Sequence, residues 1–264
     1  MRGHSYTFSH AIVRAPSESL VRGLRAEDRG DPDFARFCRH YADYVAALEA
    51  TGATVIALPP LDAFPDSVFV EDAALCLPQG AVVMRPGAPT RLGEAGLMAP
   101  TLREIYNDVR EIDAPACIEG GDILVTGQEV LVGTSARTNP DGIAALTDLL
   151  ADWGHVVRTV ETPPGVLHFK TDCSLLDDTT ILATERLAAS GCFDGYDVIF
   201  TAPGEEAAAN AIRFNDVVIM ADGFPATAER VSDAGYAVKA VGNSEAAKLD
   251  GGMSCLSLRF TPPG

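Results

Sequence analysis

The sequence has no apolar run close to the roughly 18 residues that a membrane-spanning helix needs. It also lacks the apolar core of a secretory signal, because polar residues and His10 interrupt the segment Met1–Pro16. Length alone allows one large domain or two small ones, and a 47% hydrophobic content can fill a large core. We therefore expect a cytoplasmic protein that contacts no membrane.

Positive charge is scarce. Lysine and arginine number 20 against 37 aspartates and glutamates, which gives a formal net charge of −17 at pH 7. A surface of this sign repels nucleic acid and favours the approach of a small cation. Solubility alone would also explain the charge, so the charge argues against a nucleic-acid partner without identifying a substrate.

The sequence contains no Cys-x-x-Cys pair. Its cysteines are spread along the chain at Cys38, Cys76, Cys117, Cys173, Cys192 and Cys255. This spacing is typical neither of a zinc site nor of a small disulfide-linked scaffold. In a reducing compartment we expect most of these thiols to be buried and structural, with room for one reactive cysteine that composition does not identify.

The N-terminal part of the chain predicts two short strands that flank a helix. The strands are His10–Arg14 and Thr54–Leu58, and the polar stretch Ser17–Gly30 is interpreted as a loop. Asp31 and Pro32 suit the N-cap and the first turn of the helix between the strands.

A pair of strands joined by a tight turn then recurs along the chain. Asp72, Asp122 and Asp172 each precede such a hairpin, at a spacing of about 50 residues. The hairpin strands are predicted at Ala73–Leu77 and Ala81–Met84, Ile123–Val125 and Val130–Gly133, Cys173–Leu176 and Thr180–Ala183, and, more weakly, Asn210–Phe214 and Val217–Ala221. A fifth copy, Gly251–Phe260, is cut short at the end of the sequence, and helices are predicted at Arg103–Val109, Asn139–Trp153 and Ala226–Ala234.

An internal period of roughly 40–50 residues, with a hairpin, a helix and a strand in each unit, is typical of radial repetition, as in a propeller. In such an array the starts of equivalent strands converge on the central axis. The residues before each hairpin would then meet in one central pocket. An ordinary α/β domain in which the spacing arose by chance is the alternative.

The residues at these hairpin entries are biased toward catalytic types. They are Asp66, Phe69, Glu71 and Asp72 at the first hairpin, Glu119 at the second, His168 at the third and Cys255 at the fifth. Clustered carboxylates repel one another unless a cation neutralises them, so Asp72 and Glu119 fit guanidinium acceptors better than fold stabilisers. If the segment is extended, Glu71 points to the opposite face from Asp72 and is the weaker side-chain candidate.

Each of these residues also has a structural interpretation. Cys255 alone could be a buried structural thiol, His168 a core histidine, and Glu119 a residue that flanks a turn. Their joint occurrence at equivalent positions favours a thiol enzyme with a cationic substrate.

Five ordered motifs resemble those of the dimethylarginine dimethylaminohydrolase family: FPDSVFVED (Phe64–Asp72), EGGD (Glu119–Asp122), GTSARTN (Gly133–Asn139), LHFKT (Leu167–Thr171) and DGGMSCLSLRF (Asp250–Phe260). The resemblance covers nearly the whole chain, and the motifs occur in the same order with compatible spacing. The family is grouped with arginine deiminases and amidinotransferases in a guanidino-group-modifying superfamily. The resemblance implies an α/β fold, a five-bladed propeller (pentein) of ββαβ repeats around a central pocket, in a single catalytic domain over residues 1–264.

The resemblance also implies a role for each matching residue. Cys255 matches the nucleophile, His168 the general acid/base and Glu119 the carboxylate that completes the catalytic set. In the substrate-binding set, Asp72 matches the guanidinium-binding carboxylate, Asp66 a polar contact to the amino-acid end of the substrate, and Phe69 a wall of the pocket. Arg91 and Arg137 match the pair that binds the α-carboxylate. Leu24 matches the tip of a lid loop and Leu249 a contact through its backbone carbonyl, and Glu71 is the weaker candidate. Arg85 competes with Arg91 for its role because this segment aligns least securely.

The implied activity is hydrolysis of Nω-methylated arginine to citrulline and a methylamine, through a thiouronium on Cys255. An arginine deiminase that releases ammonia and a non-catalytic binding protein on the same fold are the alternatives. The resemblance implies no metal or organic cofactor. Zinc would be at most an adventitious ligand that bridges Cys255 and His168. A homodimer is compatible with the sequence. Because nearby carboxylates raise the pKa of a thiol, we expect Cys255 to ionise mainly when substrate binds.

Overall fold

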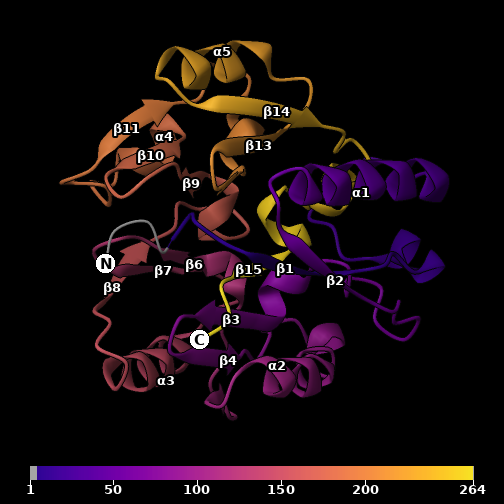
Figure 1. Cartoon of the computed structure of the whole chain (residues 1–264), viewed down its shortest axis with the longest axis vertical. Helices are drawn as coiled ribbons and strands as arrows, with labels where there is room; N and C mark the ends of the chain where they lie inside the picture. Colours follow the sequence, from indigo (N-terminus) through magenta and orange to yellow (C-terminus); the bar gives the residue numbers. More distant parts are fainter. Residues whose placement is uncertain (1–4, 264) are drawn as a thin grey trace.

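Five small sheets surround a common centre in the computed structural model, which describes residues 5–263 (Figure 1). Residues 1–4 and Gly264 lie outside the described residues. Residues 1–4 are the start of the segment Met1–Pro16 that was considered as a secretory signal. Within the described chain each sheet has three strands. Figure 1 shows the helices toward the outside of the molecule and the strands nearer its centre.

The strands in chain order are β1 (His10–Arg14), β2 (Thr54–Leu58), β3 (Ala74–Leu77), β4 (Gly80–Val83), β5 (Val109–Glu111), β6 (Ile123–Val125), β7 (Val130–Thr134), β8 (Val157–Glu161), β9 (Cys173–Leu175), β10 (Thr180–Ala183), β11 (Asp197–Phe200), β12 (Ile212–Phe214), β13 (Val217–Ala221), β14 (Ala237–Val241) and β15 (Leu258–Phe260). The α-helices are α1 (Phe34–Glu49), α2 (Ala99–Ile105), α3 (Pro140–Ala151), α4 (Glu185–Ala188) and α5 (Pro225–Asp233).

Each sheet joins an antiparallel pair to one further, parallel strand. β3 and β4 form a hairpin and β4 pairs in parallel with β5, and the same order recurs in β6-β7-β8, β9-β10-β11 and β12-β13-β14. A parallel partner requires a crossover connection, which α2, α3, α4 and α5 provide. The predicted ββαβ repeat is confirmed.

The fifth blade is built from segments near both ends of the described chain. β15 pairs antiparallel with β1, with Phe260 opposite His10, and β1 pairs in parallel with β2 after the crossover through α1. The fifth sequence copy, Gly251–Phe260, is therefore completed by the first strand, which closes the ring of blades.

The structure corrects the predicted start of α1. Its N-cap is Asp33, whose carboxylate accepts a hydrogen bond from the backbone nitrogen of Arg36 at 2.9 Å, so Asp31 and Pro32 precede the helix. The stretch interpreted as a loop also contains a 3₁₀ helix at Glu18–Arg22.

The second and fourth crossover helices also differ from expectation. α2 lies earlier than the predicted helix Arg103–Val109, because Val109 belongs to β5 and pairs with Ala81. Helix α4 was not predicted, since one helical turn is too short to show a helical period.

Short 3₁₀ helices precede the first strand of each hairpin. Those that carry site residues are η2 (Val70–Ala73), η5 (Gly120–Asp122), η6 (Phe169–Thr171) and η9 (Ser254–Leu256). η2 contacts η5 and η9, and η5 contacts η6, so the entries of separate hairpins converge as the radial repeat predicts. Apolar side chains packed between blades, such as Leu131, Phe169 and Ile181, hold these turns in place.

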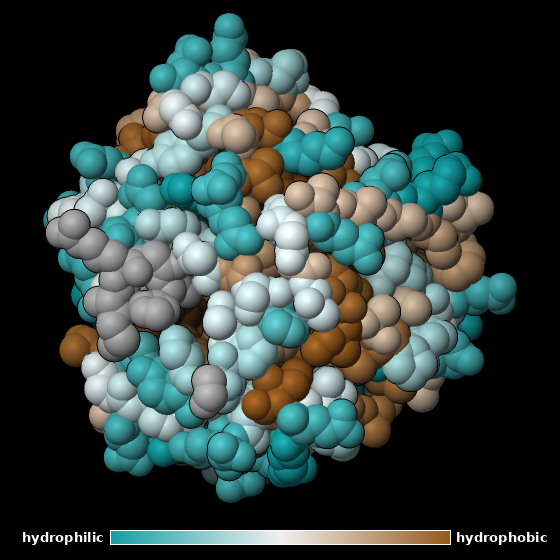
Figure 2. All heavy atoms as spheres, viewed as in Figure 1, coloured by the Kyte–Doolittle hydropathy of each residue, from teal (hydrophilic) through white to brown (hydrophobic). Residues whose placement is uncertain are grey.

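Within the described residues, none of the helices combines the length and apolarity that a membrane crossing requires. Figure 2 shows hydrophilic residues over much of one face, with hydrophobic residues between them. The strongly negative formal charge of the sequence agrees with a surface rich in polar groups.

Candidate active site

Four hairpin entries bring chemically different side chains to the centre of the propeller. Asp72 lies on η2, Cys255 on η9, and Glu119 and His168 are the N-cap residues of η5 and η6. These side chains come from four different blades and are far apart in the sequence. The common centre predicted from the repeat is therefore occupied by the predicted residue types.

A small cavity of about 30 Å³ lies among these turns. A volume of this size has room for about two water molecules. Most of the predicted site residues line the cavity: Leu24, Asp66, Phe69, Asp72, Arg91, Arg137, His168, Leu249 and Cys255. Three lining residues were not predicted, namely Leu167, Asp250 and Gly251. The predicted residues that do not line it are Glu119 and Glu71.

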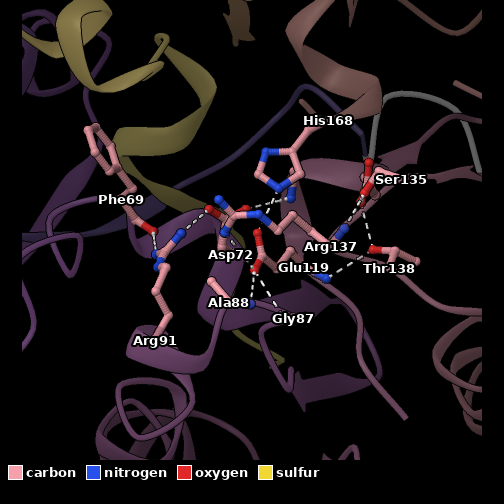
Figure 3. A network of polar contacts seen from close by, with 12 residues as sticks. Phe69, Asp72, Gly87, Ala88, Arg91, Glu119, Ser135, Arg137, Thr138 and His168 are labelled. Carbon is pink, nitrogen blue, oxygen red and sulfur yellow. Dashed lines mark hydrogen bonds and ion pairs between the residues drawn. The ribbon is translucent and has the colours of Figure 1, made fainter. Parts of the chain in front are cut away.

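Glu119 lies behind His168 instead of lining the cavity. Its Oε2 is 2.7 Å from Nε2 of His168, and its Oε1 accepts hydrogen bonds from the backbone nitrogens of Gly87 and Ala88 at 3.0 and 3.3 Å (Figure 3). The side chain is fully buried. Glu119 therefore contacts the imidazole and does not itself line the cavity, and its interpretation as a guanidinium acceptor stays a prediction.

This arrangement favours a charged imidazole. Burial opposes the charge of His168, but the carboxylates of Asp72, Glu119 and Asp122 outweigh it and raise the pKa to about 9. Burial by itself would raise the pKa of Glu119. The hydrogen bond and charge of His168, together with the charges of Arg91 and Arg137, outweigh burial and lower this pKa to about 2. At neutral pH the pair is therefore an imidazolium on a carboxylate.

Asp72 is held between a backbone donor and an arginine. Its Oδ1 accepts a hydrogen bond from the backbone nitrogen of Gly121 at 2.8 Å, and its Oδ2 lies 2.6 Å from Nη1 of Arg91. Arg91 also donates to the backbone oxygen of Phe69 and to the carboxylate of Glu94, as Figure 3 shows in part. The structure thus brings Arg91 into the site, but its partners there are protein carboxylates.

Arg85, the competitor for Arg91, is directed elsewhere. Its Nη1 donates to the backbone oxygen of Ala116 and to Sγ of Cys117. Arg137 does line the cavity, with Nη1 3.5 Å from Oε1 of Glu119. Arg91 and Arg137 are therefore the two arginines at the site.

The loop that carries Leu24 is tied to the cavity by carboxylates. The backbone nitrogen of Leu24 donates to Oδ1 of Asp66 at 2.9 Å, and that of Ala26 donates to Oδ2 of Asp250 at 2.6 Å. Burial raises the pKa of Asp66 despite the opposing charge of Arg91. A loop held by two hydrogen bonds to side chains at the rim fits the predicted lid.

The thiol of Cys255 sits in a setting that disfavours the thiolate. Burial and the charges of Glu71 and Asp72 raise its pKa to about 12, against which the backbone N–H of Gly252, 3.4 Å from Sγ, acts only weakly. Negative charge near a thiol has this effect because it destabilises a second anion. The expected elevation of the pKa by carboxylates is therefore present.

Asn210 holds the nucleophile turn and was not recognised in the sequence as a site residue. Its Oδ1 accepts a hydrogen bond from the backbone nitrogen of Ser254 at 2.9 Å, and its Nδ2 lies 3.9 Å from Sγ of Cys255. The signal for it was positional, because Asn210 stands at the entry of the fourth hairpin, as His168 does at the third.

Glu71 turns away from the cavity. Its Oε1 accepts from Nζ of Lys170 at 2.6 Å and from Nη2 of Arg259 at 2.7 Å, and its Oε2 accepts from Oγ of Ser254 at 2.7 Å. The segment is a 3₁₀ turn and not an extended strand, and the two buried cations draw the carboxylate to the other side. Glu71 therefore braces the Cys255 turn, in agreement with the expectation that its side chain points away from that of Asp72, and its assignment to the substrate-binding set stays a prediction.

Asp72, Glu119 and His168 come close to a metal-ligand set, with one donor atom of each within 4.8 Å of the others. Asp72 already accepts a hydrogen bond from Arg91. Glu119 accepts hydrogen bonds from two backbone N–H groups and from Arg137. A metal ion would have to displace both arginines. The donor set therefore fits guanidinium groups better than a metal ion.

Comparison with known proteins places the chain in a family. Residues 40–221 match the family model described as arginine deiminase. The chain is 39% identical over 257 residues to the N(G),N(G)-dimethylarginine dimethylaminohydrolase of Pseudomonas aeruginosa, which covers 96% of this chain and 100% of that protein. A protein of the same name from Streptomyces coelicolor is 32% identical, with 95% of this chain and 96% of the relative covered.

Solved structures show the same relationship. A cysteine-to-serine mutant of the Pseudomonas aeruginosa enzyme, complexed with citrulline, superposes with a TM-score of 0.94 at 38% identity over 97% of this chain and 100% of the other. A histidine-to-glycine variant of dimethylarginine dimethylaminohydrolase, an adduct with S-methyl-L-thiocitrulline, gives 0.93 at 38% identity over 96% of this chain and 100% of the other. The chain belongs to the dimethylarginine dimethylaminohydrolase family and has its pentein fold.

Proposed function

We propose that the protein hydrolyses Nω-methylated L-arginine to L-citrulline and a methylamine, through a covalent intermediate on Cys255. The observation that carries the proposal is the convergence of Cys255, the His168–Glu119 pair and Asp72 around one cavity. A thiol, a proton donor and a carboxylate are the groups that attack on a guanidinium carbon requires. The relatives named for this reaction support the assignment.

Substrate binding follows from the lining of the cavity. Asp72 receives the guanidinium group, because it is the carboxylate on the cavity that already holds a guanidinium. Asp66 at the rim receives the α-amino group. Arg91 and Arg137 receive the α-carboxylate, since arginine binds carboxylates through paired N–H donors.

Part of the wall of the site is apolar. Phe69 and Leu249 line the cavity and are nearly fully buried, so they exclude water from the substrate's methylene chain. Leu24 covers the entrance from its loop, where Asp66 and Asp250 hold the backbone. Exclusion of water strengthens each ionic contact to the bound cation.

The first chemical step forms a carbon–sulfur bond. The thiolate of Cys255 adds to the guanidinium carbon and gives a neutral tetrahedral centre. The imidazolium of His168 donates its proton to the methylated nitrogen, which leaves as the neutral amine. The remaining carbon is then a thiouronium cation on sulfur, and His168 is neutral.

The second step reverses the roles. Neutral His168 takes a proton from water, and the resulting hydroxide adds to the thiouronium carbon. The carbon–sulfur bond breaks, the sulfur leaves as a thiolate, and citrulline forms with loss of one proton to solvent. Glu119 stabilises the imidazolium in both steps through the 2.7 Å contact with its Nε2.

Ionisation of Cys255 is coupled to substrate binding. A pKa of about 12 leaves little thiolate at neutral pH. A guanidinium on Asp72 adds a positive charge beside the sulfur and lowers this pKa, and the thiol proton then passes to solvent because His168 is already protonated. The nucleophile is therefore made mainly when its target is present.

Turnover assays test the proposal. Citrulline formation is measured in parallel from Nω,Nω-dimethylarginine and from arginine. The match to the arginine deiminase model favours release of ammonia from arginine as the second candidate, and a higher rate with arginine would select it. Mass spectrometry of a reaction quenched at steady state should locate an adduct on Cys255.

A non-catalytic binding protein on the same fold gives a different result. It would bind methylarginine without forming citrulline, and Cys255→Ser would leave binding unchanged with no activity to lose. The proposal further treats residues 1–264 as one catalytic domain in the cytoplasm. Activity of the isolated chain and its recovery in the cytosolic fraction test these two points.

A further inference from the structure

The guanidinium group of Arg91 is buried inside the site and makes several hydrogen bonds there. Its side chain is 5% exposed, its Nη1 lies 2.6 Å from Oδ2 of Asp72, and its Nη2 lies 3.0 Å from the backbone oxygen of Phe69. Its Nε donates to Oε1 of Glu94 at 2.9 Å. The guanidinium of Arg91 thus occupies the carboxylate that a substrate guanidinium needs.

Two guanidinium groups would compete for Oδ2 of Asp72, because Nη1 of Arg91 already lies 2.6 Å from this oxygen. A substrate that is to contact Oδ2 of Asp72 must therefore displace Nη1 of Arg91. Displacement is costly unless the arginine finds another anion, because both partners are buried.

Glu94 gives Arg91 an anchor outside the reaction centre. Its carboxylate is buried, and its Oε2 meets no hydrogen-bond donor within the described part of the chain. Burial raises the pKa of Glu94 to about 7, with Arg91 opposing the shift. Glu94 therefore retains Arg91 near the cavity after Asp72 is lost, but as a weakened anion it does not replace Asp72 fully.

We propose that Arg91 is a resident guanidinium on Asp72 that makes binding of a substrate guanidinium conditional on a carboxylate in the same molecule. An amino acid with a guanidinium supplies both charges, so its cation takes Asp72 and its carboxylate receives the released Arg91. A guanidine without a carboxylate offers only the first exchange and therefore binds weakly. The inference rests on the proposed function for the identity of the substrate.

Arg137 provides a matched comparison. It carries the same charge at the same cavity, but it lies 3.5 Å from Glu119 and its side chain is 20% exposed. It does not contact Asp72 in the structure. Loss of Arg137 therefore removes a contact to the α-carboxylate without freeing the guanidinium site.

Binding by calorimetry in the Cys255→Ser background tests the inference without turnover. The ligands are Nω-methyl-L-arginine, its analogue without the α-amino group, and N-methyl-N′-butylguanidine, which has no carboxylate. Arg91→Ala should weaken binding of the two carboxylates and tighten binding of butylguanidine about tenfold or more, because Asp72 is left unpaired. Arg137→Ala should weaken the carboxylates and change butylguanidine less than about threefold.

Glu94→Gln gives a second test that retains Arg91. Without Glu94, Asp72 is the remaining carboxylate bonded to Arg91, so butylguanidine should bind more weakly than to the Cys255→Ser parent. This variant also covers the case in which Arg91→Ala does not fold, as judged by circular dichroism.

Three results would overturn the inference. The first is weaker binding of butylguanidine to a folded Arg91→Ala variant. The second is equal tightening of butylguanidine binding in Arg91→Ala and Arg137→Ala, which would reflect net charge alone. The third is unchanged or tighter binding of butylguanidine to Glu94→Gln. Failure of the proposed function is seen separately, as absence of citrulline from the wild-type enzyme with methylarginine.

Discussion

Nε2 of His168 lies 2.7 Å from Oε2 of Glu119, and both side chains are buried. The contact links the second and third blades and holds a proton on the imidazole at neutral pH. Because Nε2 faces Glu119, the proton that the proposed mechanism gives to the departing amine is the one on Nδ1 of the imidazolium. The state of His168 therefore depends on a residue that does not line the cavity.

Glu119→Gln should shift the alkaline limb of the pH–rate profile to lower pH. The first step needs the imidazolium, which is lost as the pH rises through the pKa of His168. That pKa is about 9 with Glu119 ionised, and removal of the negative charge lowers it. The profile of kcat is measured for the variant and for Glu104→Gln, an exposed control that should match wild type. An unmoved alkaline limb would contradict the role of Glu119.

Cys255 should be a protonated thiol in the free enzyme at pH 7 to 9. Its pKa of about 12 predicts almost no thiolate absorbance in a difference spectrum between wild type and Cys255→Ser. A saturating guanidinium ligand that is not hydrolysed should increase this absorbance, because its charge lies beside the sulfur. Full thiolate absorbance without ligand would refute activation by substrate.

Glu71→Gln should destabilise the fold by about 3–5 kcal/mol, because Lys170 and Arg259 would remain buried without their carboxylate. Urea unfolding of the variant gives the free energy. The control is Glu111→Gln, whose partner Arg103 is about half exposed, and its cost should stay below about 1 kcal/mol.

The destabilisation by Glu71→Gln should also depend on pH. Burial favours the neutral carboxyl, but Lys170 and Arg259 outweigh it and lower the pKa of Glu71 from the ordinary 4.5. A lowered pKa means that the stabilisation is complete above 4.5 and is lost as the pH falls through the folded value. The difference in unfolding free energy between wild type and variant should therefore shrink below pH 4.5, and a constant difference would contradict the ion pair.

Gly251→Ala should reduce kcat/KM about ten- to a hundredfold, since small displacements of a positioned group have large effects on rate. A Cβ at this position would lie 2.4 Å from Cε1 of Phe69, so the aromatic wall of the cavity would have to move. Gly96→Ala is the control, because its Cβ would meet no atom within 4 Å. Equal kinetics for the two variants would show that the position of Phe69 is unimportant.

The strands were predictable because each is a short apolar or β-branched run between turn residues. Ile123–Val125, Thr180–Ala183 and Val217–Ala221 have the boundaries that were predicted. The crossover helices were less predictable. α4 has one turn, and the end of α2 depends on the pairing of Val109 with Ala81 in another segment.

The site divides in the same way. The motif positions indicated that Asp72, His168 and Cys255 would meet, since equivalent hairpin entries converge on the axis. The alternation of an extended segment predicted opposite directions for Glu71 and Asp72, but it did not show which partners Glu71 would contact. The deciding contacts come from Lys170 and Arg259, which belong to other blades.

The order of apolar runs, turns and reactive residue types is a local property, so the sequence by itself determined the repeat, the hairpin entries and the chemical class of the site. Which carboxylate each cation contacts is a property of segments that meet only after folding. Tertiary structure alone therefore decided that Arg91 lies on Asp72, that Glu119 lies behind His168 and that Glu71 supports the Cys255 turn. The physical reason is that a buried charge takes the nearest opposite charge in space, whatever its distance along the chain.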